Sequence, residues 1–166
     1  MTFTKQNRLD TGDSFPEITF NSITGYSFNM PKDFDGSWGI VLLYRGEWWP
    51  FCRQQLADFQ EFADDFQKLD VRLMAASADS LEAATKVVRD YQLTFPVAHS
   101  VDAKEISSLT GSYYDENKDF VHASGFLFNR NGTIIVASYS TGSIGRLTPQ
   151  NCIALITQLQ AERVTS

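Results

Sequence analysis

One short segment, residues 44–56, holds the side chains that are best placed to do chemistry. Cys52 follows Pro50, a residue that suits the first turn of a helix, so we expect Cys52 in that turn. Backbone N–H groups at a helix start lack intrahelical partners, and the helix dipole is positive there. Both features favour a thiolate, and Arg45 and Arg53 are nearby cations. The pattern therefore predicts a nucleophilic cysteine.

The same residues also have a purely structural interpretation. Cys52 shares an apolar stripe with Leu56 and Phe59, and a free cysteine in such a stripe is often a small buried hydrophobe. Trp48 and Trp49, like the neighbouring Phe51, could line a site or simply pack. On pattern alone both interpretations stay open.

The other reactive side chains are few and scattered. Cys152 lies 100 residues from Cys52, which excludes a disulfide scaffold and a zinc site built from cysteine pairs. Because Cys152 shares an apolar helical face with Ile156, we expect it to be buried without chemistry. The two histidines, His99 and His122, are too isolated to indicate a metal centre. We expect no metal and no cofactor, and any role of the cysteines would be that of individual thiols.

Size and charge limit the possible partners. With 166 residues and 43% hydrophobic side chains, the chain is expected to form one domain over residues 13–166 after a flexible leader, residues 1–12. A net charge of −6 without a basic stripe argues against nucleic acid and membrane surfaces. No apolar run approaches the length of a membrane span, and the amino terminus lacks an apolar stretch, so we expect a cytoplasmic protein. The many aromatic residues would permit a homodimer, but a core explains them equally well.

Apolar periodicity gives an alternating order of elements. It predicts buried strands at 38–44 and 71–76 and a brief strand at 95–98. The predicted helices are an amphipathic one from Pro50 to Phe66, one opened by Asp79, a short one at 103–110 and a last one from Thr148. A hairpin of 124–129 and 133–138 is predicted around Asn131-Gly132. Strand–helix alternation followed by a hairpin indicates an α/β fold, with a mixed central β-sheet flanked by helices on both faces.

The run from Tyr44 to Cys52 resembles a known active-site signature, Tyr-Arg-Gly-x-Trp-Cys-Pro-x-Cys. That signature is typical of the peroxiredoxin-like branch of the alkyl hydroperoxide reductase and thiol-specific antioxidant family. Weaker similarities at 12–16, 93–97, 126–136 and 146–149 extend the resemblance over about residues 12–160. The resemblance implies a thioredoxin-like fold and a peroxidatic Cys52, with a hydroperoxide as substrate. The resemblance also implies that Cys52 becomes a sulfenic acid, which a second thiol then reduces.

This chain departs from the family signature at Trp49, which changes the expected source of the reducing thiol. Trp49 replaces the first cysteine of the two-cysteine relatives, and the Thr or Ser of typical peroxiredoxins, so an external thiol reductant is expected. The resemblance implies catalytic roles for Cys52 and Arg45. It implies a substrate pocket formed by Trp48, Trp49, Pro50, Phe51 and His122. Arg146 matches a recurring family arginine, with a role that could be structural.

Three hypotheses result. The first is a one-cysteine, peroxiredoxin-like antioxidant oxidoreductase that reduces hydroperoxides through Cys52. The second is a catalytically silent thioredoxin-fold binding module, in which Trp48 and Trp49 serve recognition or packing. The third is a thiol–disulfide oxidoreductase that acts with glutathione or thioredoxin.

Overall fold

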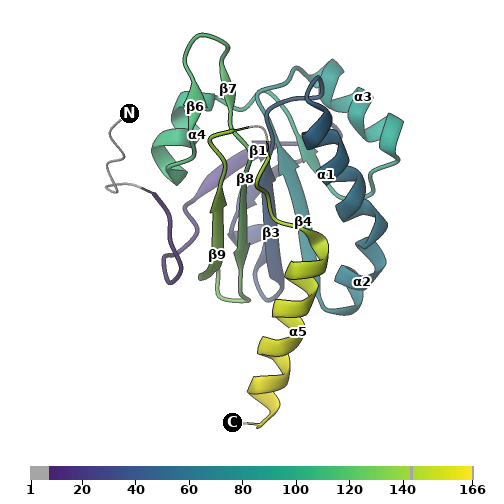
Figure 1. Cartoon of the computed structure of the whole chain (residues 1–166), viewed down its shortest axis with the longest axis vertical. Helices are drawn as coiled ribbons and strands as arrows, with labels where there is room; N and C mark the ends of the chain where they lie inside the picture. The colour runs from purple at the N-terminus through teal and green to yellow at the C-terminus, as the bar shows by residue number, and fades with distance from the viewer. Residues whose placement is uncertain (1–7, 143, 166) are drawn as a thin grey trace.

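A five-stranded mixed sheet forms the centre of the computed structural model, which describes residues 8–142 and 144–165 (Figure 1). The strand order is β5-β4-β3-β8-β9. The strands are β3 (Trp38–Leu43), β4 (Val71–Ala76), β5 (Val97–Ala98), β8 (Ser124–Phe128) and β9 (Ile134–Tyr139). β4 runs parallel to β3 and β5, whereas β8 is antiparallel to β3 and β9. The predicted mixed sheet is confirmed.

The central strand is β3, and all six of its residues are buried. An unbroken apolar run is typical of a strand covered on both faces. Side chains on one face, such as Ile40 and Leu42, belong to one hydrophobic core, and Val41 and Leu43 belong to the other. The two faces of one sheet therefore carry two cores.

Helices cover both faces, as the sequence predicts (Figure 1). One face packs against α1 (Pro50–Glu61), α2 (Ala63–Lys68), α3 (Leu81–Tyr91) and α5 (Pro149–Thr165). The other face packs against α4 (Ala103–Thr110), the 3-10 turn η2 (Lys32–Phe34) and a hairpin of β1 (Ile18–Asn21) and β2 (Ser27–Met30).

A small second hairpin lies outside the main sheet. It pairs β6 (Tyr114–Asp115) with β7 (Phe120–Val121) in antiparallel fashion. The apolar pattern did not predict this hairpin, because its two-residue strands are too short to show a period. Phe120 from this hairpin reaches the site described below.

Residues 8–12, expected to belong to a leader, make specific contacts. The Leu9 N–H donates to the Thr110 carbonyl at 3.0 Å, and the Gly12 N–H donates to the Ile134 carbonyl at 2.8 Å. The Arg8 guanidinium carbon lies 4.3 Å from the centre of the Tyr113 ring. Residues 1–7 of the expected leader lie outside the described residues.

Two helix boundaries differ from the sequence prediction. The helix expected to run unbroken to Phe66 is interrupted at Phe62, which separates α1 from α2. The apolar spacing continues across this break, so the period alone could not show it. The cap of α3 is Ser80, whose hydroxyl accepts the Ala83 N–H, and not Asp79. The Asp79 side chain instead contacts the loop that leads to Cys52.

Among the described residues, no helix is both long enough and apolar enough to cross a bilayer.

Close packing at Gly39 gives a first testable prediction. A Cβ there would overlap the ring of Phe128, which is buried on the neighbouring strand. We expect Gly39→Ala to lower the free energy of unfolding by roughly 1–3 kcal/mol, measured by urea denaturation. Gly142→Ala is the control, because a Cβ at Gly142 would have no atom within 4 Å. Equal unfolding midpoints for the two variants would contradict this prediction.

Candidate functional site

The turn between β3 and α1 positions Cys52. Beyond the last residue of β3, the Tyr44 N–H still donates to the Ala76 carbonyl at 3.0 Å, which ties the chain to β4. α1 then begins at Pro50, with Trp49 as its N-cap residue. Cys52 is the third residue of this helix, and its N–H donates to the Trp49 carbonyl at 3.1 Å. The structure therefore places Cys52 in the first helical turn.

Two N–H donors meet at the Cys52 sulfur. The backbone N–H of Arg45 donates to Sγ at 3.3 Å, and Nη1 of Arg146 donates to it at 3.2 Å. The side chain is fully buried, with 0% exposed surface. A guanidinium is always charged in proteins, so Arg146 brings a permanent positive charge to the sulfur. Both contacts therefore direct N–H donors toward the sulfur, and one of these donors belongs to a charged group.

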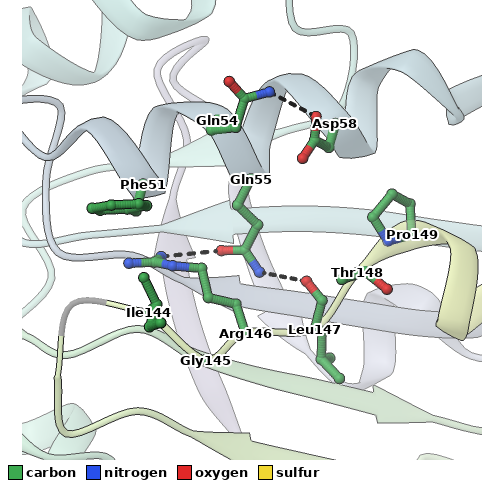
Figure 2. A pocket seen from close by; sticks show the side chains of 10 residues that line it. All are labelled: Phe51, Gln54, Gln55, Asp58, Ile144, Gly145, Arg146, Leu147, Thr148 and Pro149. Atoms are coloured by element: carbon green, nitrogen blue, oxygen red, sulfur yellow. Dashed lines mark hydrogen bonds between the residues drawn. The ribbon is translucent and has the colours of Figure 1, made fainter.

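Arg146 is itself held beside the helix by Gln55. Its Nη1 lies 3.4 Å from the Gln55 Oε1, and the Gln55 Nε2 donates to the Leu147 carbonyl at 3.1 Å (Figure 2). Gln55 is buried one turn beyond Cys52. A single buried amide thus contacts both the guanidinium and the backbone of the segment that carries it.

The loop before Cys52 is fixed at Glu47 from three directions. Its N–H donates to the Asp79 Oδ2 at 2.7 Å, and its carbonyl accepts from the Arg53 Nη1 at 2.9 Å. Its carboxylate pairs with the Lys86 Nζ at 2.7 Å. These partners lie beyond β4, on α1 and on α3, so three parts of the fold hold the loop. Arg53, expected as a cation for the sulfur, contacts this carbonyl.

Gly46 allows Asp79 to approach the loop closely. A Cβ at Gly46 would overlap Nε1 of Trp48 and lie 2.9 Å from the Asp79 Oδ1. Burial raises the pKa of the Asp79 carboxyl, and the N–H of Glu47 opposes this shift by donating to it.

The guanidinium of Arg45 packs among aromatic rings. Its central carbon lies 4.3 Å from the ring centre of Trp49, 4.7 Å from that of Phe120 and 5.6 Å from that of Trp48. Such contacts are attractive cation–π interactions. The part of Arg45 that contacts the sulfur is its main chain, and not the guanidinium on which the sequence prediction depended.

His122 lies in this aromatic group. Its ring is 5.3 Å from that of Phe120. Burial lowers the pKa of His122, and the positive charge of Arg45 lowers it further, so the imidazole is neutral at neutral pH. The residues predicted for the pocket therefore divide: Trp48, Trp49 and His122 gather around Arg45, whereas Phe51 faces another space.

Phe51 lines a cavity of about 380 Å³ between α1 and the segment before α5. Figure 2 shows the Arg146 guanidinium between Phe51 and Ile144 at one end of the cavity. The lining residues are Phe51, Gln54, Gln55, Asp58, Ile144, Gly145, Arg146, Leu147, Thr148 and Pro149. Pro50 begins α1 beside it and is exposed. The cavity thus reaches the side chain that contacts the Cys52 sulfur.

Sequence reasoning singled out Arg146 but gave it no place in the site, and it missed Gln55 and the loop contact of Asp79. The run Arg146-Leu147-Thr148-Pro149, just before the last helix, was the available signal for Arg146. Within residues 8–142 and 144–165, no group of three or more His, Cys, Asp or Glu side chains could hold a metal ion.

Comparison with known proteins decides the family. The model of the AhpC/TSA family matches residues 11–137, which is more than half of the chain. The chain belongs to the AhpC/TSA family. A Mycobacterium tuberculosis protein whose name places it among the peroxiredoxins is 30% identical over 150 residues, 87% of this chain and 94% of that relative.

The chain spans about two thirds of the length of several relatives that it matches. A peroxiredoxin of Treponema denticola is 26% identical over 141 residues, 81% of this chain and 66% of the relative. Among solved structures, Mycobacterium tuberculosis AhpC has a TM-score of 0.78 at 21% identity, with 93% of this chain and 95% of that chain covered. A yeast mitochondrial 1-Cys peroxiredoxin has a TM-score of 0.77 at 16% identity, with 92% and 77% covered. These structures confirm the thioredoxin-like fold.

The half-buried carboxyl of Asp79 gives a prediction about pH. Because its pKa is raised in the folded state, the folded chain holds this proton more tightly than the unfolded chain, and that stabilisation is lost as pH rises through the folded pKa. Asp79→Asn removes the titration and keeps an oxygen that can accept the Glu47 N–H. We expect the variant to gain stability relative to the wild type between about pH 3.5 and pH 7 in urea denaturation. A stability difference that is constant over this range would contradict the assignment.

The second cysteine gives a prediction about alkylation. Burial raises the pKa of the Cys152 thiol to about 12. We therefore expect iodoacetamide at about pH 8 to leave Cys152 unmodified in the folded protein and to modify it in urea, as read from a peptide map. Mild oxidation should give no disulfide between Cys52 and Cys152, and such a disulfide in the map would show that Cys152 is a resolving thiol.

Proposed function

We propose that this chain is a one-cysteine peroxidase that reduces hydroperoxides through Cys52 and is regenerated by an external thiol. The observation that carries the proposal is the meeting of the Arg45 N–H and the Arg146 guanidinium at the Cys52 sulfur. Membership of the AhpC/TSA family supports it.

The first half of the cycle oxidises the sulfur. The Cys52 thiolate attacks one oxygen of the hydroperoxide, an S–O bond forms and the O–O bond breaks. The sulfur loses two electrons and becomes a sulfenic acid, and the leaving oxygen takes a proton from solvent to give an alcohol or water. The guanidinium of Arg146 stabilises the negative sulfur before attack.

The second half needs a thiol from outside the chain. Cys152 is buried on α5 in the core, with a raised pKa, and the sequence has no third cysteine. An external thiol would attack the sulfenic sulfur and release water, leaving a mixed disulfide. A second external thiol would then release Cys52 and form the external disulfide.

Complete burial of the Cys52 side chain favours a second candidate, the catalytically silent binding module. In that case the half-exposed Trp48 and Phe51 would serve recognition. Action as a thiol–disulfide oxidoreductase, a homodimer and a cytoplasmic location stay predictions.

Peroxide consumption in the presence of dithiothreitol tests the proposal. We expect Cys52→Ser to consume no peroxide above background. We expect Arg146→Gln to lower the second-order rate constant roughly tenfold to a hundredfold, because one charged donor to the sulfur is lost. Arg89→Gln, which removes an exposed arginine on α3, is the matched control and should keep the wild-type rate. Wild-type turnover by Cys52→Ser would overturn the proposal and leave the binding module as the better account.

A further inference from the structure

The cavity between α1 and the segment before α5 is larger than hydrogen peroxide needs. We propose that it binds the reductant, and that the reductant is a small aliphatic thiol with an uncharged or positively charged body. This inference rests on the proposed one-cysteine function, in which the reducing thiol comes from outside.

The size and lining of the cavity suit a small organic molecule. Its volume of about 380 Å³ lies in the range of small-ligand pockets, which are mostly lined by apolar side chains. Phe51, Ile144, Leu147 and Pro149 supply apolar surface. Phe51 is 46% exposed and Ile144 is 68% exposed, so the apolar lining reaches solvent. An aliphatic chain could enter without burying an unpaired polar group.

The side chain of Arg146 connects the cavity to the reacting sulfur. Arg146 lines the cavity and also donates to the Cys52 Sγ at 3.2 Å. A thiol whose sulfur lies at Arg146 would be stabilised as a thiolate there, beside the sulfur that it must attack. The thiolate would form an S–S bond with the sulfenic sulfur, and the S–O bond would break to release hydroxide, which becomes water with the proton that the thiol lost.

The charged side chains that line the cavity select which thiols bind, through the group that each thiol carries away from its sulfur. Arg146 and Asp58 are the two charged residues among those that line the cavity. Asp58 lies one turn beyond Gln55 on α1, and its Oδ1 accepts from the Gln54 Nε2 at 2.8 Å (Figure 2). The cavity thus offers positive charge to a thiolate and negative charge to the rest of the molecule. A thiol that carries a carboxylate would be repelled by Asp58, whereas an ammonium group would be attracted.

Two thiols with the same two-carbon spacer and opposite charges test this inference. Cysteamine and 3-mercaptopropionate would each reduce Cys52 that has been oxidised with one equivalent of hydrogen peroxide, and stopped-flow kinetics would give both rate constants. We expect Asp58→Asn to lower the ratio of cysteamine to mercaptopropionate rates roughly fourfold, an effect that added salt suppresses.

Glu61→Gln is the matched control, because it removes an equal charge from α1 outside the cavity lining. An equal change of the ratio in both variants, or no change in either, would overturn the inference. It would also be overturned if Asp58→Asn and Ile144→Ser changed oxidation by cumene hydroperoxide and left the thiol rates unaltered, since the cavity would then hold the peroxide.

A second substrate separates this inference from the proposed function. Methyl methanethiosulfonate converts Cys52 to a methyl disulfide without any peroxide, and the same two thiols can then be compared by mass spectrometry. If hydrogen peroxide fails to oxidise Cys52, the proposed function is wrong. The charge preference at Asp58 is still decided by the methyl disulfide: a ratio that Asp58→Asn shifts supports the reductant cavity, and an unshifted ratio contradicts it.

Discussion

The contact between the Cys52 sulfur and two N–H donors is the constraint on which the rest of the site depends. A negative charge in a buried place is costly unless donors or cations compensate it. For a Cys52 thiolate, the Arg45 N–H and the Arg146 guanidinium would supply that compensation, at 3.3 and 3.2 Å. The two donors come from residues 101 positions apart in the chain, so only the folded sheet and its flanking segments bring them together.

The surrounding structure serves to hold those two donors. Glu47 is fixed through its N–H, its carbonyl and its carboxylate, which sets the course of the loop that starts at Arg45. On the other side, Leu147 packs so closely on Gly125 of β8 that a Cβ there would lie 2.6 Å from it. Gln55 joins the two sides by contacting Arg146 and the backbone next to it. The site is therefore an assembly of loops held by the ends of the central strands, as is common in α/β folds.

Local sequence patterns predicted the helices and strands. They could not predict the contacts between residues that are distant in sequence. The buried run at 38–44, the helix start at Pro50 and the hairpin at Asn131-Gly132 were all visible in the sequence, because each depends on neighbouring residues. The Arg146 contact with the sulfur, 94 residues away, and the loop contact of Asp79 depend on tertiary packing. A cation close in sequence, such as Arg45, was the natural prediction, and its guanidinium instead found aromatic partners that no spacing rule reveals.

The central claim is that Cys52 is a peroxide-reactive thiolate. Its most direct test is the mass of the protein after brief exposure to substoichiometric hydrogen peroxide with a sulfenic-acid trap, followed by a peptide map. The account predicts one trapped adduct, located at Cys52 and formed within seconds, while Cys152 stays unmodified. A protein that remains unmodified, or an adduct located at Cys152, would contradict it.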